Sequence, residues 1–233
     1  MTDVSTLIRQ LRASDQRGVG RVEYLENGPD SIDRLLALES EATQIRAYDW
    51  RVVPGLLQTP AYSSGVIQAT NPRLSEREVM RRTFLKNARV EALKDRLDAA
   101  PGLERATFVL GERAITQAIG GGNLGAHARQ LEYLLKMSEH PRVVLLALPE
   151  HVIPAGLAFH FTEYTFGGES DRQRLGYQES VMGGWYSTRL EDTVRLQNAF
   201  ADLVGAALGP HDTRQLIREV LRPWNANTKG LPS

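Results

Sequence analysis

Two apolar runs with an amphipathic stretch between them constrain this fold more than any other feature of the sequence. Residues 106–110 (ATFVL) and 143–148 (VVLLAL) contain one threonine and otherwise only apolar side chains, which predicts strands buried on both faces. Between them, residues 125–138 place Leu131, Leu134 and Leu135 inward at helical spacing. A strand, a helix and a second strand at this spacing predict a parallel βαβ unit with a right-handed crossover.

The first half of the chain is predicted to be mainly helical. Apolar residues at a 3.6-residue period and capping signals predict helices over residues 30–48, 59–69 and 75–97. The third of these helices opens with a capping box formed by Ser75 and Glu78.

The second half alternates between short strands and glycine turns before it ends in helices. Strands are expected around residues 159–166 and 174–180, with turns at Gly167-Gly168 and Gly183-Gly184. Helices are expected over residues 192–208 and 211–221. The predicted class is mixed α+β, in which N-terminal helices pack on a small mixed sheet with a βαβ unit and C-terminal helices follow.

This order of elements suggests one main domain with two less ordered ends. An N-terminal arm and linker are expected over residues 1–34, a binding domain over 35–222, and a tail over 223–233.

Charge and composition exclude several classes of function. Lysine and arginine together number 28, as do aspartate and glutamate, so the net charge is zero and a general electrostatic DNA binder is not expected. The absence of cysteine excludes disulfides, thiolate nucleophiles and cysteine-ligated zinc. The longest buried-looking apolar run, Val143–Leu148, is far shorter than the roughly 20 residues that span a bilayer. A cytoplasmic protein without a membrane partner is therefore expected.

The familiar cofactor and catalytic motifs are absent or out of context. Gly120, Gly122 and Gly125 satisfy G-x-G-x-x-G, but about nine residues separate them from the preceding strand. A dinucleotide site needs its first glycine at the end of that strand, so a plain glycine loop is expected. The five histidines show no metal-binding spacing, and neither a P-loop nor a nucleophile elbow occurs. We therefore expect neither a cofactor nor a metal.

One candidate site lies on the last predicted strand. Alternation sends Tyr177 and Glu179 to the same face, and Trp185 and Tyr186 follow just beyond the glycine turn. A phenol and a carboxylate beside aromatic rings suit ligand orientation or acid–base chemistry. The alternative is structural: Tyr177 packs in the core while Glu179 pairs with one of the many arginines.

A second candidate site lies on the first predicted helix and its end. Glu39, Arg46 and Trp50 are spaced at i, i+7 and i+11, so they can share a helix face. Arginine and tryptophan together can clamp an anionic or planar ligand. An internal ion pair between Glu41 and Arg46 is the alternative.

Several strings of residues resemble a known family. They are VPGLLQTPAY at residues 53–62, IGG at 119–121, QL at 130–131 and YQE at 177–179. They resemble the domain that follows the helix-turn-helix in antitoxin-like, Cro/repressor-type (XRE) transcriptional regulators of high-GC Gram-positive bacteria. The similarity covers roughly residues 35–222, and the resemblance implies the sensing or partner-binding half of such a regulator.

The chain departs from that family in two respects. Regulators of this type carry about 60 to 70 residues of helix-turn-helix before the domain, whereas 34 residues without a pair of short helices precede the match here. Specific DNA binding by this chain alone is therefore not expected. In addition, Lys86-Asn87 stands where the family tends to show Arg-Gln.

Two functions remain as expectations. The first is a stand-alone module that binds a small molecule, or a partner such as a small antitoxin-like protein, without a DNA-binding head. The second is a cofactor-independent cyclase, isomerase or lyase of specialised metabolism, with Tyr177 and Glu179 as catalytic groups. The expected pocket lies between the N-terminal helices and the strands, and its ligand-binding residues are Arg46, Trp50, Tyr177, Glu179 and Trp185.

Overall fold

The structure is a computed structural model, which describes residues 6, 30–119, 124–154, 159–168, 170–180 and 183–228. Gly120 and Gly122 of the G-x-G-x-x-G string, and most of the predicted N-terminal arm, lie outside the described residues.

A six-stranded mixed sheet forms the centre of the fold, with the strand order β3-β2-β1-β4-β5-β6. One half is parallel and consists of β1 (Gln44–Asp49), β2 (Arg105–Gly111) and β3 (Val143–Leu148). The other half is antiparallel and consists of β4 (Phe161–Phe166), β5 (Gln173–Ser180) and β6 (Gly183–Ser187). Strand β1 joins the halves, because it pairs in parallel with β2 and antiparallel with β4.

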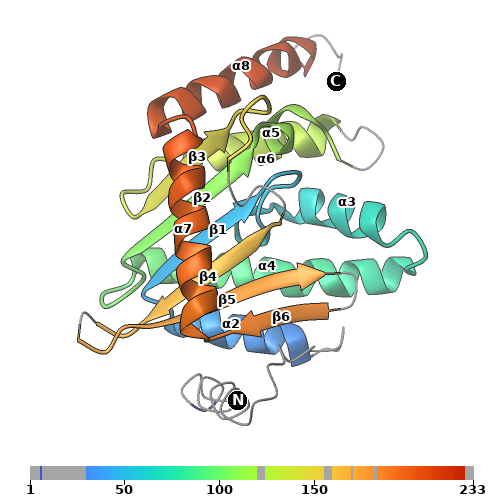
Figure 1. The fold of residues 1–233 in the computed structure, drawn as a ribbon. Helices are drawn as coiled ribbons and strands as arrows, with labels where there is room; N and C mark the ends of the chain where they lie inside the picture. Colours follow the sequence, from blue (N-terminus) through green and yellow to red (C-terminus); the bar gives the residue numbers. More distant parts are fainter. Residues whose placement is uncertain are drawn as a thin grey trace.

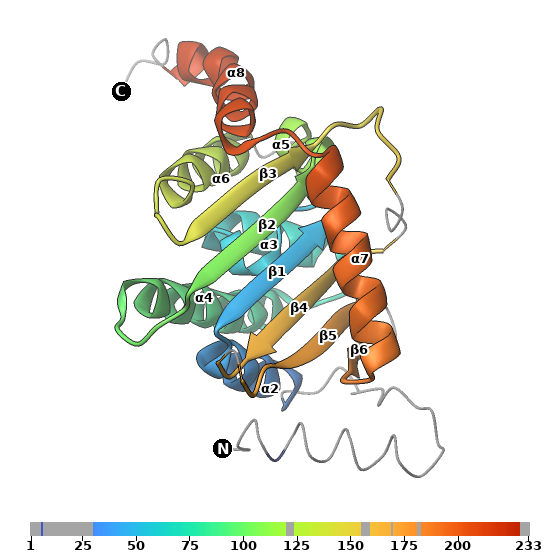
Figure 2. The same cartoon turned by 60° about the vertical axis from the view of Figure 1, so that its left-hand side comes forward.

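Helices cover both faces of this sheet, as Figures 1 and 2 show. One face carries α2 (Asp30–Glu41), the 3-10 helix η1 (Gly55–Leu57), α3 (Pro60–Thr70), α4 (Glu76–Asp98) and α6 (Leu124–Met137). The opposite face carries α7 (Leu190–Ala206) alone among these helices. The short α5 (Glu112–Thr116) follows β2, and α8 (Pro210–Thr228) packs against α6 and β3. No helix in the described part of the chain has the length and apolar character needed to cross a bilayer.

The architecture confirms the predicted mixed α+β class. The unit β2–α5–α6–β3 is the expected parallel βαβ unit, and α3, α4 and α6 fall within a residue or two of the predicted helices. Ser75 caps α4 as predicted, because its Oγ accepts a hydrogen bond from the backbone N–H of Glu78 at 3.3 Å.

Two predictions of local structure were wrong. The helix expected over residues 30–48 ends at Glu41, and Gln44–Asp49 forms the central strand β1 instead. This segment alternates in burial between Ile45, Ala47 and their polar neighbours, and a run this short fits helical and strand periods equally well. The expected turn at Gly183-Gly184 is instead the start of β6. Gly184 suits that strand because an added Cβ would lie 2.8 Å from the Tyr177 ring.

The hydrophobic core has two parts, one on each face of the sheet. The larger part lies under α2, α3, α4 and α6 and includes Ile45, Ala47 and Tyr164. The smaller part lies under α7 and includes Tyr48, Phe161 and Phe200. Successive residues of β1 therefore point to opposite cores, as strand alternation requires.

The string at residues 53–62 ties the helices of the larger face together. The side chain of Gln130 on α6 accepts a hydrogen bond from Thr59 N at 2.7 Å and donates one to Leu57 O at 2.6 Å. Val53 N donates to the Tyr62 hydroxyl at 3.2 Å. Because Leu57 is fully buried among these contacts, the segment anchors α3 and α6 to each other.

We predict that Leu57→Ala lowers the free energy of unfolding by roughly 2–4 kcal/mol, because the variant leaves a cavity in this anchor. Urea unfolding of the full chain measures the change. Ile153→Ala is the matched control, since that side chain is 82% exposed and its loss should change stability by less than about 0.5 kcal/mol. An unchanged midpoint for Leu57→Ala would contradict the anchoring role.

Candidate functional site

Side chains from three strands meet at one edge of the sheet. The register pairs Tyr48 with Phe161 and Thr162 with Tyr177, so the end of β1, the start of β4 and the end of β5 lie at the same edge. Asp49 therefore lies near His160 and Glu179. In open sheets with parallel strands, ligands typically bind at the carboxyl ends of those strands, which makes this edge the place to look for a site.

Helix α4 places a lysine against this edge. Val79, Val90 and Leu93 are buried on the face of α4 that packs on the sheet, and Lys86 falls at the centre of that face, seven residues from both Val79 and Leu93. The side chain is half-buried. Its ammonium group forms no hydrogen bond or ion pair with any residue that the structure describes.

The electrostatics around Lys86 follow from this position. Burial is the main cause that lowers the pKa of the Lys86 ammonium, and the neighbouring charges of Arg89 and Arg82 lower it further. The carboxylates of Glu179 and Asp49 oppose these effects. Lys86 is therefore a cation whose charge is only partly compensated.

A fully paired ion cluster lies behind Lys86. Arg89 makes a bidentate contact with Glu39 on α2, with Nε–Oε2 and Nη2–Oε1 distances of 2.9 and 2.5 Å. The Tyr164 hydroxyl on β4 donates to the same carboxylate at 3.0 Å. Although burial lowers the pKa of the Arg89 guanidinium, Glu39 raises it, so the pair stays charged.

Two tyrosines extend the cluster along β5 and β6. The rings of Tyr177 and Tyr186 pack with their centroids 4.8 Å apart. Burial and then the charge of Glu179 raise the pKa of Tyr177, so its phenol is a neutral donor. The buried Tyr186 hydroxyl has no hydrogen-bond partner among the described residues.

Asp49, at the end of β1, supplies a second carboxylate that acts on Lys86 by charge. Its Oδ1 accepts hydrogen bonds from the backbone N–H groups of Arg51 and Val52, at 3.0 and 3.2 Å. Burial raises the pKa of Asp49, while these two hydrogen bonds and the charges of His160 and Lys86 lower it. We call Asp49, Lys86, Tyr177 and Glu179 the Lys86 cluster.

The structure places Tyr177 and Glu179 on the same face of β5, as predicted. Tyr177 packs against the larger core, in line with the structural alternative. Glu179, however, is exposed and forms no ion pair within the described part of the chain. Its carboxylate is therefore available to a ligand.

The structure does not bring all five predicted ligand-binding residues together. Arg46 lies on the α7 face, where its Nη1 is 3.4 Å from Glu163 Oε2 and its guanidinium is 5.8 Å from the centre of the Phe200 ring. Trp185 pairs with Gln178 and so faces away from Tyr177. Trp50 follows β1 at the edge where Glu179 lies.

The helical arrangement predicted for Glu39, Arg46 and Trp50 was therefore wrong, because a strand replaces the second half of that helix. The alternative pair between Glu41 and Arg46 was also wrong, since Arg46 pairs with Glu163 and Glu39 pairs with Arg89. Glu163 was not predicted. It is fully buried between Arg46 and Arg174, and burial raises its pKa.

Sequence reasoning did not assign Lys86, Arg89 or Asp49 to a site. A signal for Lys86 was present, because a lysine interrupts the apolar period Val79, Val90, Leu93 of an otherwise regular helix. The partners of Arg89 had no such signal, since Glu39 lies 50 residues away in the chain.

Chemically, this edge offers an ammonium and a phenol as donors and two carboxylates as acceptors. Such a set can hold a polar molecule through several hydrogen bonds, and it can also move a proton. Across the described ranges, no group of three or more histidine, aspartate and glutamate side chains is placed to hold a metal ion.

We predict that Glu39→Gln destabilises the fold by roughly 3–5 kcal/mol, because it leaves Arg89 as a buried charge without a counterion. Thermal and urea unfolding measure this change. The control Glu150→Gln removes one member of the exposed Arg113–Glu150 pair and should cost less than about 1 kcal/mol. Equal effects of the two substitutions would contradict the structural role of Glu39.

Comparison with known proteins assigns the chain to a family. A search of curated proteins finds no match to the chain. Residues 32–219, however, match the model of a family described as a domain of unknown function, DUF5753. The match covers the sheet and every helix of the site, and it spans well over half of the chain. The chain belongs to the DUF5753 family.

Proposed function

We propose that this chain is a binding module for a small polar molecule, held at the Lys86 cluster. The observation that carries the proposal is the unpartnered ammonium of Lys86 on the core-facing side of α4. A charged group that is partly withdrawn from water and lacks a partner destabilises the fold, and such groups concentrate at functional sites.

The neighbours of Lys86 support this interpretation over a purely structural one. Arg89, three residues along the same helix, forms an ion pair with Glu39, and the Tyr164 hydroxyl donates a hydrogen bond to the same carboxylate. Glu179 and Asp49 act on Lys86 by charge, yet neither comes within ion-pair distance of its ammonium. A hydrogen-bond acceptor on a bound ligand would give the Lys86 ammonium the partner that the described residues do not provide.

The chemistry of the cluster suggests the class of ligand. An anionic or strongly accepting group would meet the ammonium of Lys86, and a donor on the same molecule would meet the Glu179 carboxylate. Tyr177, on the same strand face as Glu179, supplies a neutral phenol and an aromatic surface. We therefore propose a small zwitterionic or polyhydroxylated acid as the ligand.

Sensing in a transcriptional regulator is the context that we propose for such binding. It rests on the resemblance of the VPGLLQTPAY string and its companions to the domain that follows the helix-turn-helix in XRE-type regulators. In that setting the ligand, or a small antitoxin-like partner, would shift the equilibrium between two states of the regulator by binding one of them more tightly.

Catalysis at the same cluster is the second candidate, and one observation favours it. A lysine with a lowered pKa beside two carboxylates is suited to proton transfer as well as to binding. A cofactor-independent isomerase, cyclase or lyase would use Lys86 or Glu179 for that step. Mass spectrometry of a bound molecule before and after incubation distinguishes binding from conversion.

We predict that Lys86→Met raises the free energy of unfolding by about 1–3 kcal/mol and abolishes ligand binding, because it removes an uncompensated charge that the ligand needs. The test is native mass spectrometry of the full chain with a panel of amino acids, hydroxy acids and sugar acids, followed by thermal shift measurements. Lys136→Met, on the exposed end of α6, is the control and should change neither property. A destabilised Lys86→Met variant would contradict the proposal.

The proposal also predicts how binding depends on pH. The pKa of Lys86 is lower in the folded protein than its ordinary value, so Lys86 loses its proton at a lower pH than a free lysine does. Affinity for an anionic ligand should therefore fall as the pH is raised toward about 10, and the stability cost of Lys86 should shrink over the same range. Calorimetric titrations at several pH values measure the affinity, and a flat profile would exclude Lys86 as the anchor.

A further inference from the structure

The face of α4 that points away from the sheet carries exposed apolar side chains. Phe84 is 73% exposed and Met80, one turn earlier, is 65% exposed. A hollow of about 290 Å³ lies beside them, between α3 and α4, and is lined by Pro60, Ser64, Met80, Thr83, Phe84 and Asn87. Large apolar side chains next to a hollow are typical of a protein contact rather than of a solvated helix face.

Charges on this face follow a regular order around Phe84. Arg77 lies seven residues before Phe84, Glu91 lies seven residues after it, and Asp95 follows one turn later. All three side chains are exposed. At 3.6 residues per turn these positions fall along one stripe, which is basic at its beginning, apolar in the middle and acidic at its end.

The charges of Arg77 and Asp95 on this stripe do not stabilise the helix α4 itself. Arg77 lies in the first turn and Asp95 in the last, which is the reverse of what the helix dipole favours. Neither residue has an ion-pair partner in the part of the chain that the structure describes. Glu91 forms an ion pair with Lys94 at 2.9 Å. Because this pair is exposed, it adds little to the stability of the helix.

We infer that this stripe binds a second copy of the same chain, with the two α4 helices packed antiparallel about a two-fold axis near Phe84. In such a pair, a residue seven positions before Phe84 lies opposite the residue seven positions after it in the other copy. Arg77 of each copy then meets Glu91 of the other, so that the face complements itself. The two Phe84 rings fill the centre, and the hollow beside them accepts an apolar side chain of the second copy.

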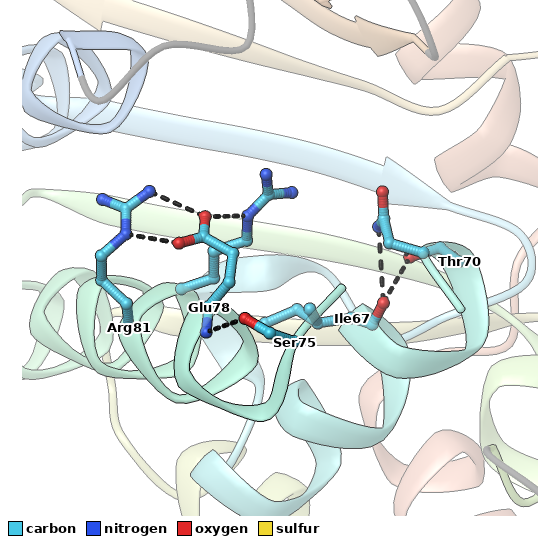
Figure 3. A network of polar contacts seen from close by, with 7 residues as sticks. Ile67, Thr70, Ser75, Glu78 and Arg81 are labelled. Carbon is cyan, nitrogen blue, oxygen red and sulfur yellow. Dashed lines mark hydrogen bonds and ion pairs between the residues drawn. The ribbon is translucent and has the colours of Figure 1, made fainter. Parts of the chain in front are cut away.

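The corner that supports this face is already fixed in one chain. Figure 3 shows Ser75 capping α4 and Arg81 beside the Glu78 carboxylate. The Nε atoms of Arg81 and Arg82 each donate to that carboxylate at 2.8 Å. Hydrogen bonds of these two arginines lower the pKa of Glu78 to about 2. On the other side of the turn, Thr70 Oγ1 and Asn71 Nδ2 both donate to Ile67 O at 3.4 Å. These hydrogen bonds fix the end of α3 and the start of α4, and the two helices pack against each other within one chain. The surface is therefore ordered before a partner arrives, which reduces the entropy lost on association.

Analytical ultracentrifugation of the full chain over a range of concentrations tests the inference. The wild type should form a dimer that weakens as salt is added, because Arg77 and Glu91 are exposed. Phe84→Asp should leave only monomer. Leu190→Asp, at an equally exposed apolar position on α7, is the control and should leave the dimer unchanged.

Charge reversal then tests the antiparallel register. Arg77→Glu alone and Glu91→Arg alone should each weaken the dimer by roughly tenfold or more, because like charges then face each other. The double variant Arg77→Glu/Glu91→Arg should recover the wild-type dissociation constant to within about threefold. A monomeric wild type, a dimer that survives Phe84→Asp, or a double variant as weak as the single ones would each overturn the inference.

Discussion

The bidentate contact between Glu39 and Arg89 holds this structure together at the place where its layers meet. It joins α2 to α4, and through the hydroxyl of Tyr164 it joins both helices to β4 in the sheet. Arg96, two turns further along α4, also donates to the backbone oxygen of Glu39 at 3.1 Å. Because these charges lie in the larger core, they fix the rotation of α4 about its axis far more strictly than apolar packing alone would.

That rotation determines what each side of α4 can do. With Arg89 turned toward Glu39, Lys86 lies at the sheet edge where Asp49 ends β1 and Glu179 is the penultimate residue of β5. The same rotation leaves Phe84 and Met80 on the outside. One helix therefore carries the proposed ligand site on its inner face and the proposed contact with a second copy on its outer face, so binding at one face can influence the other through a single rigid element.

Periodicity in the sequence was sufficient to predict much of the fold and only part of the site. The βαβ unit and the capped helix α4 were predictable, because buried strands and caps depend on neighbouring residues. The central strand β1 was not, since Gln44–Asp49 becomes a strand through pairing with β2 and β4, about 60 and 120 residues later in the chain. Alternation along one strand predicted that Tyr177 and Glu179 share a face, and the structure confirms that placement. Arg89 required knowledge of which elements pack together, which local spacing does not contain.

The position of β1 also has a consequence for how the protein emerges from the ribosome. At a synthesis rate of roughly 5–20 residues per second, β4 follows β3 by about 1–3 s, and during this time the parallel half can begin to assemble while one edge of β1 still lacks its neighbour. An unpaired central edge is a template for unwanted strand addition. The nascent chain therefore passes through an interval in which its central strand has one open edge, and this interval ends only when residues 161–166 leave the exit tunnel.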